Sequence, residues 1–272
     1  MNRKNLAEVF SGLKNKHEIA FIPFTVLGDP DKNTSIRIIK AMIDGGADIL
    51  ELGMPFSDPV SDGPVIQKAD MRALDSGIKI DDCFDIIREI RKNSDIPIGL
   101  LMYANLIFRR GIDKFYRECK DVGINSVLVA DVPYEERGPF SEAALKFDIQ
   151  PIYIVTPLTS DARVCKIASA CQGFLYVVTR LGVTGTSKSI AVGIKKELSR
   201  LSGLTDLPLC VGFGISTPEH VGVLAHTEAS GAITGSALVR LIEKNLSEHD
   251  NMIVEITEFV RNMKAATVRI RD

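Results

Sequence analysis

The chain has 272 residues, of which 45% are hydrophobic and 25% are charged, as in an ordinary globular protein. The 33 basic residues nearly balance the 35 acidic ones, so the net charge of −2 excludes a basic field that would recruit nucleic acid or anionic lipid. A chain of this length can bury a substantial core, and α/β barrels often reach it as one unit.

The N-terminal segment predicts a helix over 5–15 rather than a targeting sequence. It lacks the continuous apolar core of a signal peptide. No later stretch approaches the ~18 uncharged apolar residues that a membrane span needs. The sequence therefore predicts a cytoplasmic protein.

Eight apolar, β-rich segments follow, with amphipathic helical patterns between them. The predicted strands cover 18–27, 47–52, 96–103, 125–130, 149–155, 173–178, 207–213 and 231–235. The predicted helices cover 34–46, 81–93, 111–123, 135–147, 160–170, 191–201, 217–226 and 247–266. Strands this apolar, separated by helices, are typical of a parallel sheet that is covered on both faces.

These eight repeats predict an α/β fold, a single (β/α)8 TIM barrel domain over 1–272 with an extra N-terminal helix. No linker rich in glycine, serine or proline interrupts them. An open Rossmann-like sheet is the alternative, but the first strand is followed by LGDPD (27–31) rather than by G-x-G-x-x-G. In the barrel, the helix over 5–15 would plug the floor and the last helix would close the outer ring.

The second strand carries a carboxylate where the active site of such a barrel is built, at the C-terminal end of the strand. Alternation puts Ile49, Glu51 and Gly53 on one face, which is the lumen if the leucines between them face the helices. A dry lumen disfavours the charged form, so the pKa of Glu51 should rise until the group can both give and take a proton. A buried structural glutamate is the alternative, and the position favours catalysis.

The connection over 53–67 is long and carries two further acids, Asp58 and Asp62. Three prolines and a glycine stiffen it, which indicates that the acids are aimed rather than merely solvated. For either aspartate alone, a turn or cap role fits equally well. Tyr103 and Tyr176 end or lie within strands near the mouth, and each taken singly is better explained as core.

Two other chemistries lack the residues that they require. None of the predicted strands contains a lysine, which disfavours a Schiff base. The four histidines lie on terminal or helical segments, and the five cysteines include no C-x-x-C pair, so neither a metal site nor a disulfide framework is predicted. Acid–base chemistry by carboxylates remains.

Glycine-rich turns after the seventh and eighth strands predict a phosphate site. The segments 211–216 (VGFGIS) and 234–239 (TGSALV) both run into helices, and their glycines let backbone N–H groups approach an anion. This is the usual phosphate position in barrels. The segment 179–189 is polar and long, as in a mobile lid or a floppy surface loop, and its Gly185 offers a further N–H.

Apolar residues on several predicted strands and on the connection after the second strand would line the space between the acids and the phosphate site. They are Phe24, Ile66, Leu101, Leu128 and Ile154. A substrate should therefore be phosphorylated at one end and flat or apolar at the other.

Taken together, these segments strongly resemble the tryptophan synthase α subunit family. LELGMPFSDPVSDGP (50–64) is similar to that family's signature after the second strand. GLLMYANLIF, SVLVADVP, RLGVTG, GFGIS and GAITGSALV resemble its later segments in the same order. The resemblance covers nearly the whole chain, from FIPFTVLGDP to KAAT near the C-terminus.

The resemblance implies retro-aldol cleavage of indole-3-glycerol phosphate to indole and glyceraldehyde 3-phosphate, with no cofactor in this subunit. It gives Glu51 the role of general acid and base, Asp62 that of partner to the indole N–H, and Tyr176 an auxiliary role. The implied phosphate positions are Gly185, Gly214, Gly235 and Ser236. The implied indole contacts are Phe24, Ile66, Leu101, Tyr103 and Leu128.

The resemblance also implies a partner, a pyridoxal-phosphate-dependent β subunit in an α2β2 assembly. Asp58 would communicate with the lid around Thr184 and with the partner, and contacts would come from 58–59 and Asn105. The chain departs from the family's usual residues at Met54, Val60, Ser61, Val65 and Leu181. None of these removes a group that the chemistry needs, although Leu181 would alter how the lid seats.

Two other functions deserve comparison. Another phosphate-binding TIM barrel, an isomerase or epimerase, would also place carboxylates at strand ends, but with a smaller and more polar pocket and no need for a long connection after the second strand. A barrel kept only as a scaffold would be expected to lose Glu51 or Asp62, and both are present.

Overall fold

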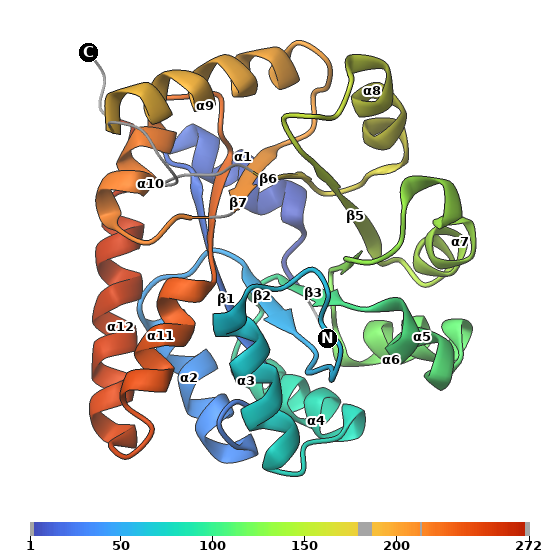
Figure 1. The fold of residues 1–272 in the computed structure, drawn as a ribbon, viewed down its shortest axis with the longest axis vertical. Coiled ribbons are helices and arrows are strands. Elements are labelled where there is room, and N and C mark those ends of the chain that lie inside the picture. The colour runs from blue at the N-terminus through green and yellow to red at the C-terminus, as the bar shows by residue number, and fades with distance from the viewer. Residues whose placement is uncertain (1–2, 179–186, 213, 270–272) are drawn as a thin grey trace.

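In the computed structural model, eight parallel strands close into a barrel that helices surround (Figure 1). The structure describes residues 3–178, 187–212 and 214–269. The strands pair in chain order, and β8 pairs with β1 to close the sheet. They are β1 (Ala20–Val26), β2 (Leu50–Gly53), β3 (Ile98–Met102), β4 (Ser126–Val129), β5 (Gln150–Val155), β6 (Leu175–Val178), β7 (Leu209–Gly212) and β8 (Gly231–Thr234). The predicted (β/α)8 barrel is confirmed.

The helices of the first half are α1 (Leu6–Asn15), α2 (Lys32–Asp44), α3 (Pro64–Asp75), α4 (Ile80–Arg91), α5 (Ala104–Arg110) and α6 (Ile112–Val122). Those of the second half are η1 (Tyr134–Glu136), α7 (Gly138–Lys146), α8 (Asp161–Ala170), α9 (Ser187–Ser202), α10 (Pro218–Ala225), α11 (Ser236–Lys244) and α12 (His249–Ala265). Within the described ranges, none is long and apolar enough to cross a membrane.

The connection after β2 is shorter than the sequence suggested. Helix α3 begins at Pro64 with Gly63 as its N-cap, so Val65, Ile66 and Gln67 are helical rather than part of a loop. Proline suits the first helical position because the N–H that it lacks would have no partner there. The sequence patterns also missed α5, which Gly111, at φ +88°, separates from α6.

The strands bury both of their faces, in two separate apolar layers. Leu50 and Leu52 pack outward against the helices, whereas Ile49 belongs to the layer inside the barrel. The predicted alternation along β2 is therefore confirmed, and it directs Glu51 into the lumen. Helix α12 packs against α2 and α11 and closes the outer ring, as predicted (Figure 1).

Helix α1 closes the floor of the barrel. Its apolar face, Leu6, Phe10 and Leu13, is buried in the same layer as the lumen residues. The ring of Phe10 meets that of Phe174 edge-on, with 6.1 Å between centroids. Asn5 caps the helix through a side-chain bond to the N–H of Ala7. With the floor filled, the cavity of the lumen lies at the C-terminal ends of the strands.

We predict that Phe10→Ala destabilises the fold by about 3 kcal/mol, because it leaves a cavity between α1 and the lumen. The measurement is urea unfolding followed by circular dichroism. Val254→Ala is the control, since Val254 on α12 is 62% exposed and should cost under about 0.5 kcal/mol. Equal stability of the two variants would show that α1 does not fill the floor.

Candidate active site

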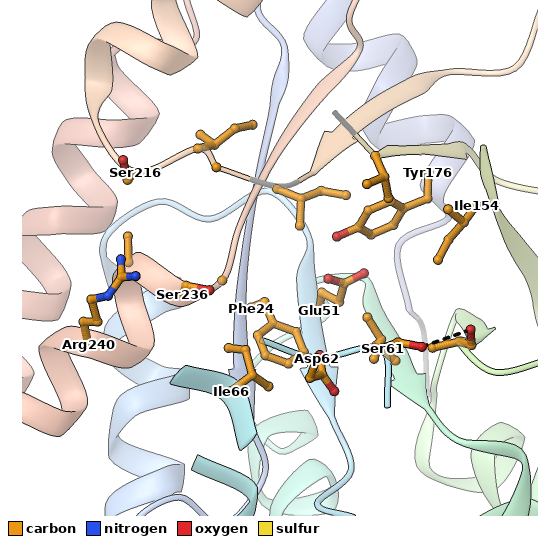
Figure 2. A pocket seen from close by; sticks show the side chains of 18 residues that line it. Phe24, Glu51, Ser61, Asp62, Ile66, Ile154, Tyr176, Ser216, Ser236 and Arg240 are labelled. Atoms are coloured by element: carbon orange, nitrogen blue, oxygen red, sulfur yellow. Dashed lines mark hydrogen bonds between the residues drawn. The ribbon is translucent and has the colours of Figure 1, made fainter. Parts of the chain in front are cut away.

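A cavity of about 280 Å³ opens at the C-terminal end of the barrel. This is close to the lower end of the ~300–1,000 Å³ range of small-molecule sites. All eight strands, or the residues just beyond them, contribute to its lining (Figure 2). Most of the wall is apolar and consists of Phe24, Ile66, Leu101, Ile154, Val178 and Ile233.

Glu51 is the buried carboxyl of this cavity. It lies within β2, paired in register with Phe24 of β1 and Gly99 of β3, and it is only 6% exposed. Burial, and after it the charge of Asp62, raises the pKa of Glu51 from 4.5 to about 8. The group is therefore mostly protonated at pH 7, yet its ionised form is within reach. This rise agrees with the expectation from its place in the lumen.

Two glycines make room for the aromatic rings of the cavity. A Cβ on Gly53 would lie 2.8 Å from Cζ of Phe24, and one on Gly212 would overlap the hydroxyl of Tyr176. Burial raises the pKa of Tyr176 well above its usual value, so the phenol keeps its proton. Its hydroxyl and the Glu51 carboxyl face the same space (Figure 2).

Asp62 is held at the rim by Tyr103. The Tyr103 hydroxyl donates to Oδ2 of Asp62 at 2.7 Å and accepts the N–H of Ser61 at 3.1 Å. The ring of Phe56 stacks on Tyr103, with centroids 5.1 Å apart. Burial raises the pKa of Asp62 above the ordinary aspartate value, and the bond from Tyr103 opposes this rise. One carboxylate oxygen is thus fixed, and the other can serve a ligand.

Asp70 is a second buried carboxyl, behind the β2–α3 loop. Its Oδ1 accepts a long bond of 3.4 Å from the N–H of Phe56, and its Oδ2 has no partner among the described residues. Burial, and after it the charge of Asp62, raises the pKa of Asp70 to about 8. The sequence patterns miss this residue because they assign the start of α3 to the connection over 53–67 and predict no helix over 68–75. On a helix, Asp70 falls on the buried face with Ile66 and Ala73.

Three of the four predicted phosphate positions, Gly214, Gly235 and Ser236, line the opposite side of the cavity. Gly214 lies in its lining at φ +81°, a conformation that favours glycine. Gly235 caps α11 and Ser236 begins it, so the first N–H groups of that helix have no partner within it. The turn after β7 is fixed by a bond from the N–H of Ser216 to Nδ1 of His220, at 3.3 Å.

The structure places the other predicted site residues as follows. Phe24, Ile66 and Leu101 line the cavity, but Tyr103 and Leu128 do not. Tyr103 stands behind Asp62, and Leu128 packs in the lumen layer. Asp58 and Asn105 are exposed and lie outside the lining. Leu181, Thr184 and Gly185 fall outside the described residues, as does most of the predicted lid.

The sequence patterns do not identify three polar residues of the lining, Ser61, Ser216 and Arg240. Arg240 had a readable signal, because it follows Ser236 by four residues and a helix puts such residues on one face. All five cysteines are free thiols. Among the residues that the structure describes, no three histidine, cysteine or acidic side chains gather to hold a metal. Catalysis without a metal stays a prediction.

Comparison with known proteins agrees with this geometry. The family model for the tryptophan synthase alpha chain matches residues 10–268. The tryptophan synthase alpha chain of Methanoregula boonei is 50% identical over 261 residues, which are 96% of this chain and 98% of that protein. The alpha chain of Enterobacter sp. is 49% identical over 259 residues, 95% of this chain and 96% of that protein.

Solved structures agree as well. Tryptophan synthase subunit alpha of Legionella pneumophila superimposes with a TM-score of 0.89 at 32% identity, covering 98% of both chains. A chain of the tryptophan synthase α2β2 complex of Pyrococcus furiosus superimposes with a TM-score of 0.83 at 34% identity, covering 90% of this chain and 98% of that one. Because the family model spans nearly all of the barrel, the chain belongs to the tryptophan synthase alpha chain family.

Proposed function

We propose that this chain carries out its family's lyase reaction of tryptophan biosynthesis, the cleavage of indole-3-glycerol phosphate to indole and glyceraldehyde 3-phosphate, with Glu51 and Asp62 as the reacting groups. The observation that supports these roles best is a carboxyl with a pKa of about 8 that faces an apolar cavity beside a second carboxylate. At neutral pH such a carboxyl can give a proton, and once ionised it can take one back.

Glu51 makes both proton transfers of the reaction, first as an acid and then as a base. Protonated Glu51 gives its proton to C3 of the indole ring, which leaves positive charge on the ring nitrogen. The carboxylate then takes the proton of the hydroxyl on the carbon attached to C3. That carbon becomes the aldehyde, and the electron pair of the broken C–C bond returns to the ring to restore indole. Glu51 ends protonated, as it began.

Asp62 stabilises the charge that develops on the ring nitrogen. Its carboxylate would accept the indole N–H and offset the positive charge in a site of low dielectric. The Tyr103 hydroxyl keeps Asp62 in place by donating to its Oδ2. Because burial keeps Tyr103 and Tyr176 protonated, both hydroxyls act as hydrogen-bond donors and not as bases.

The shape of the cavity fits the two ends of this substrate. The indole ring would pack against Phe24, Ile66 and Leu101. The phosphate would bind the N–H groups at Gly214, Gly235 and Ser236, at the start of α11. A phosphosugar isomerase or epimerase, the alternative function, handles a small polar substrate that would leave this apolar wall in water.

We also propose that the chain binds a pyridoxal-phosphate-dependent β subunit and needs no cofactor of its own. The Pyrococcus furiosus relative comes from an α2β2 complex. In this chain, three large apolar side chains are exposed beyond C-terminal strand ends: Val60 at 79%, Phe108 at 57% and Leu158 at 96%. Val60 directly follows the predicted contacts at 58–59, and Phe108 lies on the same helix as Asn105. A single domain over 1–272 and a cytoplasmic location stay predictions from the sequence.

Glu51→Gln should lower kcat for indole formation by at least about 10³-fold, because the amide can make neither proton transfer. The fold should survive, since glutamine has nearly the same shape. Indole release and thermal unfolding are the measurements. Glu142→Gln, on the exposed surface of α7, is the matched control and should keep full activity. Full activity of Glu51→Gln would contradict the mechanism.

The rate should also depend on pH through Glu51. Because its protonated form begins the reaction, kcat/KM should fall as the pH rises through about 8. Asp70 titrates in the same range, so Asp70→Asn is the control and should keep the alkaline fall. The measurement is initial rate from pH 6.5 to 9.5. A profile that is flat to pH 9.5, or a fall that disappears in Asp70→Asn, would contradict the role of Glu51.

A further inference from the structure

Arg240 brings a full positive charge to the end of the cavity where the phosphate is proposed to bind. It lies on α11, four residues after Ser236 and three after Ala237, and all three line the cavity. This spacing puts them on one helix face. Figure 2 shows Arg240 and Ser236 on the same side of the cavity, across from Tyr176 and Ile154.

No acidic residue of the described ranges pairs with the guanidinium of Arg240. In the described part of the chain, no hydrogen bond or ion pair joins Arg240 to another residue, although other charges on α11 are paired. Glu243 binds Lys68 at 3.1 Å, and Lys244 binds Glu255 at 3.0 Å. Arg240 is exposed, so its long side chain can turn toward a ligand without breaking a hydrogen bond or ion pair to the described residues.

The charges of the cavity are unfavourable for an anionic substrate without Arg240. Among the described lining residues, Asp62 is a carboxylate, Glu51 is mostly protonated at pH 7, and Arg240 is the single basic residue. A phosphate monoester carries a charge of about −1.5 to −2 at pH 7. The start of a helix offers about half a positive charge, which neutralises only part of the phosphate charge. A guanidinium adds a full charge and can bind two phosphate oxygens at once.

We propose that Arg240 is a specificity-determining residue of this site, which binds the dianionic tail of the substrate and speeds its capture, and which takes no part in bond cleavage. This inference rests on the proposed function for the identity of the substrate. Arg240 would then supply part of the affinity for phosphate, and the backbone N–H groups would supply the rest.

The test compares Arg240→Gln and Arg240→Lys with Arg261→Gln, which removes the same charge from the exposed surface of α12. Glycerol 3-phosphate, which carries the tail without the ring, is titrated by calorimetry. Arg240→Gln should weaken its binding about tenfold. Arg240→Lys should weaken it less, because the charge remains but the forked geometry is lost. Arg261→Gln should bind as the parent chain does.

Kinetics separate capture from chemistry. For indole-3-glycerol phosphate, Arg240→Gln should raise KM about tenfold and leave kcat within about threefold. Its kcat/KM should also respond less to added salt than that of Arg261→Gln, because a steering charge is gone. Binding of indole, which has no phosphate, should be unchanged.

Two results would overturn the role of Arg240. One is glycerol 3-phosphate binding in Arg240→Gln equal to that in Arg261→Gln. The other is an equal loss of indole and glycerol 3-phosphate binding, which would indicate a structural role. If the parent chain binds glycerol 3-phosphate through Arg240 but does not cleave indole-3-glycerol phosphate, the proposed function fails while the anion site stands.

Discussion

The burial of one carboxyl group, that of Glu51, is the constraint on which the site depends. Moving its pKa from 4.5 to about 8 means that the ionised form is disfavoured by on the order of 5 kcal/mol relative to water. A stable barrel can carry this cost because its two apolar layers are continuous around the strand. The same cost makes the group a useful acid at neutral pH, and a strong enough base once its proton has left.

Three other parts of the structure surround the buried Glu51 carboxyl. Helix α1 fills the floor, so water cannot reach the carboxyl from below. Asp62 sits at the rim, where Tyr103 fixes it and its charge pushes the pKa of Glu51 upward. The proposed phosphate site lies across the cavity, where glycine turns and the start of α11 present N–H donors instead of acidic side chains. Acidic and cationic features thus occupy separate ends of one small space.

Much of the fold was predictable because parallel strands buried on both faces leave a clear apolar signal. Alternation alone places Glu51 in the lumen, and the glycines after the seventh and eighth strands predict turns that line the same cavity. The patterns failed where local signals conflict. Pro64 and Gly63 indicate a turn, yet they also suit the start of a helix, so α3 and its buried Asp70 were missed. The partnership of Tyr103 with Asp62 joins segments 41 residues apart, and no local pattern encodes it.

The ionisation of Glu51 can be measured directly in the resting chain. Carboxyl carbons labelled with ¹³C in glutamate report titration by NMR, and the signal that is absent from a Glu51→Gln sample identifies the group. With the cavity as dry as the structure indicates, this signal should titrate near pH 8. A midpoint between about 4 and 5, the range of a solvated glutamate, would contradict the central role of its burial.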